Sequence, residues 1–508
     1  MITSGEWLEY LWHYRNGRKS TIIVGDSFGD NCKRAAEGAW SEHFDTFIRV
    51  SGGSNTGGTR WILGKDGQMY EMIFHLVPSE WPYKRSIIGD WVLVDVDRLN
   101  QEISQIMMIV GTAQQPLHIS GNAPLWLPYY GLVEAYLEMI KGKDAVGVTK
   151  RGIAPTIAAV NLRVGPLVRH LLDRDRLYKW VMGCYKAFEL MLKELEDQLA
   201  DTDEAFELAD YHPDKVTEQI LATAEKIKPF ICNTGPIVRD LLQKNEPVMI
   251  GLSQGFGLHR FGTYPFNSSG QILASDAASC LGVPMRLLGP TILASKLINT
   301  RVGNGPFPTG WWNRDEALRY PIEHPELFSV LEEHDEGERK AFLEKMRLKI
   351  NGGQYSQIDL AQYMQVLLNN LGATTKRGRE PGGPDLHITA CACWRNGVDV
   401  IALSQMDVIG NLDFDFPIAT EYHLDGSPLP VPVIPDVDDL PRVDVKTTKV
   451  EVRLRNTDLY GETDLPPVVQ QICDLYYRYT GVPVGFISTS PRSDKGSNFY
   501  DVSSMLPA

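Results

Sequence analysis

Short apolar runs alternate with longer amphipathic stretches along most of the chain. The runs are rich in β-branched side chains and predict strands at Thr21–Val24, Trp91–Val96, Pro247–Leu252, Val398–Leu403 and Val482–Ile487. The amphipathic stretches predict helices at Lys33–Phe44, Asp173–Leu199 and Pro213–Ile227. Alternation of this kind predicts an α/β fold with a central, mostly parallel β-sheet flanked by helices.

Three other segments have less regular patterns. Residues 313–371 have a helical pattern and are expected to form a helical insertion, in which Ser356 and Asp359 have the spacing of a helix start. His387–Trp394 carries two cysteines two residues apart and predicts a strand with both on one face. Asp413–Asp444 is rich in proline and aspartate and predicts irregular surface chain.

The composition narrows the possible classes of protein. The chain has 508 residues, 43% hydrophobic and 22% charged, which is typical of a globular protein with a large core. Its net charge of -14 argues against nonspecific nucleic-acid binding. The seven scattered cysteines suggest neither a disulfide framework nor a metal site. No signal-peptide pattern or membrane-length apolar run is present, so we expect a cytoplasmic protein without a membrane partner.

The glycine-containing loop Gly25–Lys33 lies between the first predicted strand and the first predicted helix. Its backbone N–H groups could hold a phosphate, which Lys33 could contact, and Asp30 could hold Mg²⁺ or accept a proton. The spacing differs from that of a P-loop, and the final Ser or Thr is missing. The alternative interpretation is that Asp30 caps the helix.

Two further loops carry candidate chemistry. In Ser51–Thr59, four glycines surround Asn55, which favours close backbone approach to a ligand or, alternatively, a flexible hairpin. Leu371–Arg379 combines two threonine hydroxyls with two guanidinium groups, which suits a small dicarboxylate, although an arginine-rich surface loop has the same pattern. Segments compatible with simple turns are Thr149–Pro155, Leu162–Gly165, Ser253–His259, Gly262–Phe266 and Thr300–Pro308.

In this order, and together with His75–Ser79, Ser404–Asp407 and Ser488–Pro491, these segments resemble the landmarks of the adenylosuccinate synthetase family. The resemblance extends over about Ile22–Arg492 and implies one large domain spanning 1–508. It also implies a carbon–nitrogen ligase. In that reaction a nucleoside triphosphate phosphorylates the 6-oxygen of a purine nucleoside monophosphate, and the amine of L-aspartate then displaces the phosphate.

The resemblance implies roles for individual residues. Positions that match catalytic groups, with Asp30 as general base, are Asp30, Lys33, Gln254 and His75. Positions that match monophosphate-binding groups are Asn55, Thr149, Arg163, Gln254 and Val302, and those that match the aspartate loop are Thr374, Thr375, Arg377 and Arg379. Positions that match triphosphate-binding groups are Gly29, Lys33, Gly57, Gly58, Thr59, Gln405, Asp407, Ser490 and Pro491. The resemblance further implies Mg²⁺ on Asp30 and Gly57, and a homodimer, because the counterpart of Arg163 reaches in from a second subunit.

Several positions depart from the family pattern. Gly58 stands where the family has a catalytic histidine, and the loss of such a group typically costs about 10²–10⁴-fold in rate. In the first loop Asn31 replaces a glutamate, and Cys32 and Arg34 replace glycines, which narrows the phosphate cradle. Gln405 replaces a lysine that packs along the nucleotide base, so ATP or dATP becomes an alternative to GTP.

The expected function is therefore ligation of L-aspartate to C6 of a purine nucleoside monophosphate, with IMP favoured over GMP or dGMP. One alternative is an ATP-dependent ligase that joins aspartate to dGMP or GMP and forms N6-succino-2-aminoadenylate, as in the phage branch of the family. Asp30 argues against that branch, because its members replace the catalytic aspartate. The other alternative, suggested by Gly58, is a catalytically impaired nucleotide-binding paralogue.

Overall fold

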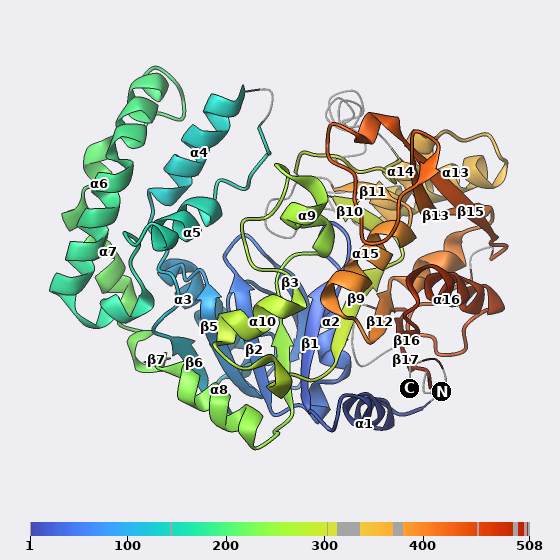
Figure 1. The fold of residues 1–508 in the computed structure, drawn as a ribbon, viewed down its shortest axis with the longest axis horizontal. Helices are drawn as coiled ribbons and strands as arrows, with labels where there is room; N and C mark the ends of the chain where they lie inside the picture. The colour runs from blue at the N-terminus through green and yellow to red at the C-terminus, as the bar shows by residue number, and fades with distance from the viewer. Residues whose placement is uncertain are drawn as a thin grey trace.

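A single large sheet forms the centre of the molecule (Figure 1). The computed structural model describes residues 2–142, 145–301, 303–311, 336–368, 379–454, 457–490, 496–501 and 505. Within these residues the sheet has ten strands, in the spatial order β17 (Ser497–Phe499), β16 (Val484–Ser488), β12 (Val400–Ser404), β9 (Thr291–Lys296), β1 (Ser20–Gly25), β8 (Val248–Gly251), β2 (Thr46–Gly52), β5 (Arg85–Val92), β6 (Leu117–Ser120) and β7 (Ile231–Cys232). Every neighbouring pair is parallel except β16 and β17, which confirms the predicted fold class.

Helices pack around this sheet, and those with α-helical geometry have the following bounds. They are α1 (Ser4–Tyr14), α2 (Lys33–Ala39), α3 (Val96–Val110), α4 (Tyr130–Lys141), α5 (Ile153–Asn161), α6 (Arg174–Leu199), α7 (Pro213–Ala224), α8 (Thr234–Gln243), α9 (Arg260–Thr263), α10 (Ala274–Leu281), α13 (Glu336–Asn351), α14 (Gln357–Leu367), α15 (Leu386–Asn396) and α16 (Pro467–Thr480). In Figure 1, α4, α6 and α7 stand together at one end of the molecule. Helices α13, α14 and α16 lie at the other end. No helix in the described ranges is both long and apolar enough to cross a membrane.

Strands β1, β8, β12 and β16 form where the apolar runs predict them, whereas no run predicted the central strands β2 and β9. All six residues of β1 are buried, and its neighbours β8 and β9 are parallel to it. A strand covered on both faces needs side chains that pack well on a pleated surface, and Thr21–Val24 supplies β-branched ones. The run Trp91–Val96 is the exception, because only its first two residues belong to β5 and α3 begins at Val96.

Two of the predicted helix starts have side-chain caps. Asp173 accepts a hydrogen bond from the backbone N–H of Arg176 at the start of α6. Ser356 and Asp359 form the reciprocal capping box at the start of α14, which confirms the predicted helix start. The residues that flank α13 and α14, 312–335 and 369–378, lie outside the described ranges, so an insertion over 313–371 stays a prediction.

The prediction of a strand at His387–Trp394 is wrong, because this segment lies within α15. Asp385 caps the helix by accepting a hydrogen bond from the N–H of Ile388 at 3.1 Å, and Gly397 ends it in the left-handed conformation. Small and apolar side chains are buried around most of this helix. An α-helix buried on nearly all sides lacks an amphipathic pattern, which is why the sequence is ambiguous here.

The prediction of irregular chain over Asp413–Asp444 is also wrong for much of its length. Strand β13 (Asp415–Leu424) forms a long antiparallel ladder with β15 (Val443–Glu451), and β14 (Ser427–Pro428) adds to its other edge. Phe416, Ile418 and Tyr422 are buried on one side of the ladder. The buried residues keep a spacing of two across the bulge between Ala419 and Glu421, but Pro417 within the run is atypical of a strand and favours the irregular interpretation.

Two small antiparallel ribbons lie beside the central sheet. Strands β3 (Gly58–Leu63) and β4 (Met69–Phe74) form a hairpin, and β10 (Asn299–Arg301) pairs with β11 (Glu380–Gly382). Both ribbons begin or end at residues of predicted loops, namely Gly58 and Arg301. They therefore help to place these loops next to the carboxyl ends of the parallel strands.

Candidate active site

A cavity of about 770 Å³ opens at the carboxyl ends of the parallel strands. The loops that follow β1, β2, β8, β12 and β16 all contribute to its lining. Neighbouring parallel strands end at the same edge of a sheet, so loops distant in sequence meet there. Predicted site residues that line the cavity are Gly29, Asp30, Lys33, Asn55, Gly57, Gly58, Thr59, Thr149, Gln254, Arg379, Gln405, Asp407 and Ser490.

Other predicted site residues lie elsewhere. Val302, Thr374, Thr375, Arg377 and Pro491 lie outside the described residues. Within the described ranges, His75 and Arg163 do not line the cavity. Arg163 is exposed at the end of α5, with a left-handed backbone conformation.

The first loop turns sharply before α2 begins. Asp30 and Cys32 have φ values of 50° and 58°, and Gly29 has 98°, so three of four consecutive residues are left-handed. Such conformations are uncommon for residues other than glycine and cluster at functional sites. The residue at the cap position of α2 is Cys32, which makes no side-chain cap hydrogen bond, so the alternative role of Asp30 as a helix cap is excluded.

The carboxylate of Asp30 instead forms an ion pair with Arg379. The distance from Arg379 Nε to Asp30 Oδ2 is 2.8 Å, and both side chains line the cavity. Arg379 is the last residue of the predicted aspartate loop and immediately precedes β11. The ion pair therefore brings together two segments that are far apart in the sequence.

Lys33 points its amine toward the backbone of another loop. Its Nζ donates a hydrogen bond to the carbonyl of Gln254 at 2.5 Å, and Gln254 itself has a φ of 66°. Burial lowers the pKa of Lys33 to about 8, although the nearby carboxylates of Glu37 and Asp30 act in the opposite direction. An additional negative charge nearby would therefore stabilise the protonated form of Lys33.

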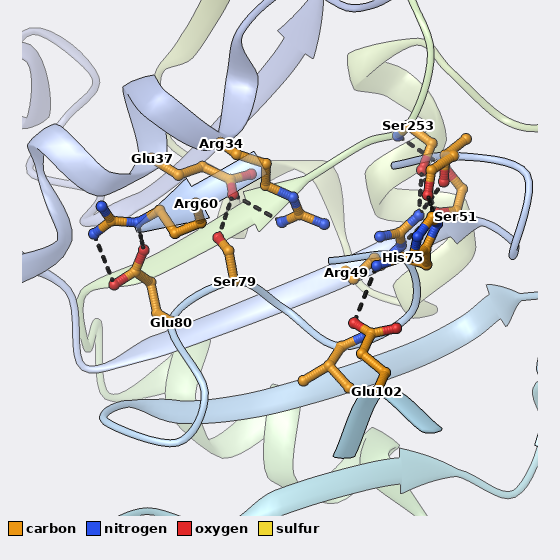
Figure 2. A network of polar contacts seen from close by, with 12 residues as sticks. Arg34, Glu37, Arg49, Ser51, Arg60, His75, Ser79, Glu80, Glu102 and Ser253 are labelled. Atoms are coloured by element: carbon orange, nitrogen blue, oxygen red, sulfur yellow. Dashed lines mark hydrogen bonds and ion pairs between the residues drawn. The ribbon is translucent and has the colours of Figure 1, made fainter. Parts of the chain in front are cut away.

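Arg49 is a buried cation that the sequence analysis did not assign to the site. It lies in β2, donates from Nε to the Ser51 carbonyl and from Nη2 to Ser253 Oγ, both at 3.3 Å, and also contacts Thr56 (Figure 2). Burial lowers the pKa of Arg49 to about 9. These bonds tie the loop after β2 to the loop after β8. Arg34 and Glu37 also line the cavity without an assigned role.

His75 supports the loop from behind. Its Nδ1 lies 3.0 Å from the Thr56 carbonyl, and Glu102 accepts backbone N–H bonds from His75, Leu76 and Val77 at 2.9–3.1 Å. Burial, with the nearby charges of arginine side chains, lowers the pKa of His75 to about 4, so its imidazole is neutral at pH 7. In this position His75 stabilises the loop after β2 and does not face the cavity.

The far side of the cavity carries residues from the loop after β12. Gln405 has a φ of 63°, and its side-chain Oε1 is buried with no hydrogen-bond partner among the described residues. Burial raises the pKa of Asp407 to about 6. A buried amide oxygen and a carboxylate two residues apart in sequence suit a ligand that donates hydrogen bonds.

Fold and cavity define an α/β protein in which loops from five parallel strands surround a cavity lined by several charged side chains. The model of the family described as adenylosuccinate synthetase matches residues 22–496. The chain therefore belongs to the adenylosuccinate synthetase family and is an enzyme of the carbon–nitrogen ligase class EC 6.3.4.

Relatives of known name match over most of their length. The adenylosuccinate synthetase of Koribacter versatilis is 27% identical over 488 residues, which cover 94% of this chain and 95% of the relative. That of Nocardioides sp. is 28% identical over 407 residues, covering 80% of this chain and 81% of the relative.

Two solved structures share the fold. The fully ligated adenylosuccinate synthetase of Plasmodium falciparum has a TM-score of 0.70 at 20% identity, over 95% of this chain and 100% of that one. The cyanophage S-2L succinoaminodeoxyadenylate synthetase, solved with dGMP and dATP, has a TM-score of 0.50 at 13% identity, over 96% and 97%.

The lowered pKa of Lys33 leads to a measurable pH dependence. We expect acylation of Lys33 by acetic anhydride, followed by mass spectrometry, to rise with a midpoint near pH 8, because only the neutral amine reacts. At pH 7 about a tenth of Lys33 amines are then neutral, against about 0.03% for an ordinary lysine. A bound phosphorylated anion should shift the midpoint upward. Lys296, whose pKa burial also lowers to about 8, is the matched control and should stay unmodified in the folded protein, since it is fully enclosed. An acylation midpoint of Lys33 near pH 10.5, the ordinary lysine pKa, would contradict the lowered pKa.

Proposed function

We propose that this ligase joins L-aspartate to C6 of a purine nucleoside monophosphate, with IMP as the favoured substrate, at the expense of a nucleoside triphosphate. The observation that carries the proposal is the ion pair of Asp30 and Arg379 in the cavity wall. It supports a site in which a base on the first loop and a carboxylate-binding arginine face the same ligand. The family to which the chain belongs supports the reaction class.

In the first step of the proposed reaction, Asp30 takes the N1 proton of the purine. The 6-oxygen then attacks the γ-phosphorus, so an O6–P bond forms while the bond from the γ-phosphorus to its bridging oxygen breaks. The electron pair of that bond leaves with the nucleoside diphosphate. Lys33 binds phosphate oxygens in this step, a role that its contact with Gln254 in the cavity wall supports, and phosphoryl transfer depends mainly on such positioning and charge stabilisation.

In the second step the neutral amine of aspartate attacks C6. A C–N bond forms, the C6–O bond breaks, and inorganic phosphate leaves with the electron pair. The nitrogen then releases its one extra proton to solvent, and Asp30 releases the proton that it took from N1, which restores the base. Arg379 holds a carboxylate of aspartate as a charge-assisted hydrogen-bond donor, and it exchanges Asp30 for that carboxylate when the substrates bind.

The donor set at the first loop fits Mg²⁺. Mg²⁺ in nucleotide sites uses one or two carboxylates, with phosphate oxygens and water as the remaining ligands. Asp30 and the backbone of Gly57 both line the cavity and are the residues that would hold the ion. Across the described residues, His, Cys, Asp and Glu side chains form no cluster of three or more, as expected if substrate oxygens complete the shell. When bound, Mg²⁺ would neutralise charge on the phosphates.

The identity of the triphosphate depends on the loop after β12. The unpartnered amide oxygen of Gln405 and the raised pKa of Asp407 both favour a base that donates hydrogen bonds. The exocyclic amines of adenine and guanine both satisfy that requirement. We therefore propose GTP or ATP as the donor.

Direct assay tests the proposed function. The protein is incubated with Mg²⁺, L-aspartate and each pairing of IMP, GMP or dGMP with GTP, ATP or dATP, and succino-nucleotides are measured by mass spectrometry. We expect product from IMP. The dGMP–dATP pairing is included because the cyanophage enzyme was solved with these nucleotides. If dGMP is the only monophosphate that gives product, dGMP replaces IMP as the proposed substrate. No product in any pairing would refute the proposed function.

Substitutions at the ion pair should separate its two halves. Asp30→Asn is isosteric but cannot take the proton, so kcat should fall about 10²–10⁴-fold with little change in the KM for aspartate. Arg379→Gln removes a charge-assisted bond worth about 1.5–3 kcal/mol, so the KM for aspartate should rise roughly 10–150-fold. Both are measured by steady-state kinetics, with thermal unfolding as the folding control. Equal effects of the two variants on kcat and KM would argue that the pair is structural.

The exposed position of Arg163 supports a proposed homodimer in which each subunit completes the site of the other. Arg163→Ala and Asp30→Asn should each be inactive alone. After subunit exchange a mixed dimer contains one site with both residues intact, so about a quarter of wild-type activity should return if half of the dimers are mixed. No recovery despite mixed dimers would show that Arg163 acts within its own subunit or not at all.

A further inference from the structure

The side chain of Arg34 occupies the space above Gly58. A Cβ atom added to Gly58 would lie 2.4 Å from Arg34 Cγ, 3.3 Å from Nε and 3.4 Å from Cδ. The closest of these is near the root of the side chain, so Arg34 would need another rotamer to make room. Both residues line the cavity. Glycine at position 58 is thus the condition for the present position of Arg34.

A buried carboxylate fixes the guanidinium of Arg34. Arg34 Nη1 lies 2.8 Å from Glu37 Oε2, which also accepts a bond from Ser79 Oγ at 3.2 Å (Figure 2). Glu37 in turn lies over Gly251, where a Cβ would be 2.7 Å from its Oε1. Gly58 therefore leaves space for the aliphatic part of Arg34, and Glu37 fixes its guanidinium group.

Cations gather at this wall of the cavity. Lys33, Arg34 and Arg49 all line it, and the charge of Arg34 adds to burial in lowering the pKa of Arg49. Glu37 is paired with Arg34 and acts on Lys33 and Arg49, Glu102 acts on Arg49 alone among the three, and Asp30 is already paired with Arg379. Like charges held close together away from water are unfavourable without an anion. The arrangement therefore fits a ligand group with several negative charges.

We propose that the side chain of Arg34, which lies over Gly58, binds the phosphoryl group during its transfer. Glu37 is the positioning residue for Arg34. This inference rests on the proposed function and concerns its first step, in which the O6–P bond forms and the bond to the leaving diphosphate breaks. Arg34 takes no proton in this step, because a guanidinium stays protonated. It donates hydrogen bonds to phosphoryl oxygens on which negative charge gathers.

An exchange of side chains tests the proposal. Arg34→Gly should lower kcat by about 10²–10³-fold, as the loss of a donor to developing charge does elsewhere. Gly58→His alone should also be slow, because the imidazole and the stem of Arg34 compete for one space. The double variant R34G/G58H frees that space for a new donor and should be at least about tenfold faster than Arg34→Gly. Glu37→Gln should lower kcat about tenfold while the KM for aspartate stays within about threefold, since Glu37 acts on the cations of this wall, whereas Arg379 is paired with Asp30.

Arg60 provides a matched control. It forms an ion pair with Glu80 at 2.9 Å, and these side chains are 12% and 6% exposed, against 16% and 4% for Arg34 and Glu37. Neither Arg60 nor Glu80 lines the cavity formed by the described residues. Arg60→Gly should therefore keep kcat within about threefold of wild type, and thermal unfolding verifies that both glycine variants are folded.

A binding measurement separates failure of this inference from failure of the proposed function. In wild type, calorimetry should show tighter binding of the triphosphate than of the diphosphate, and Arg34→Gly should reduce this preference by about tenfold or more. Loss of the preference supports Arg34 even if no succino-nucleotide is ever formed. A folded Arg34→Gly variant that keeps both the preference and a kcat within threefold of wild type would overturn the inference.

Discussion

The removal of positive charge from water at the carboxyl edge of the central sheet is the constraint on which this site depends. Burial lowers the pKa of Lys33, Arg49 and Lys296, which lie on or behind the loops of the cavity. Buried cations are unfavourable unless they are paired. The protein supplies part of the compensation through Asp30 and Glu37. The negative charge of a phosphorylated ligand supplies the rest. The burial of these cations, which is unfavourable in the empty site, therefore favours binding of the ligand.

The backbone around these charges is correspondingly unusual. Asp30, Cys32, Gln254 and Gln405 all have positive φ values, and all line the cavity. Each lies in a loop that follows a parallel strand, where a rigid sheet can impose a conformation that an isolated loop would avoid. The strands thus fix the loops, and the loops fix the charged side chains. A cavity built in this way needs little rearrangement of its backbone to receive a ligand.

The sequence was sufficient to predict the α/β class, the strands β1, β8, β12 and β16, and many of the loops that line the cavity. Strands with both faces covered are apolar along their whole length, and glycine-rich turns after such strands must meet at one edge. It failed at α15, where an almost wholly buried helix has no polar face, and at β13, where Pro417 interrupts a run that otherwise alternates. Arg49 had a signal that was not used, namely a single charge within an otherwise apolar strand. The contact of Arg34 with Gly58 could not be read from spacing, because it joins the start of a helix to the start of a hairpin.

The reciprocal fit of these two residues also constrains how the sequence could have changed. A side chain at position 58 would occupy the same space as Cγ of Arg34, so a sequence that has both side chains is sterically crowded. The form with glycine at both positions leaves that volume empty and clashes with nothing. Exchange of one residue for the other therefore proceeds through the empty intermediate, and the effect of a substitution at either position depends on what occupies the other. Such epistasis makes position 34 the place to look when position 58 varies among divergent members of the family.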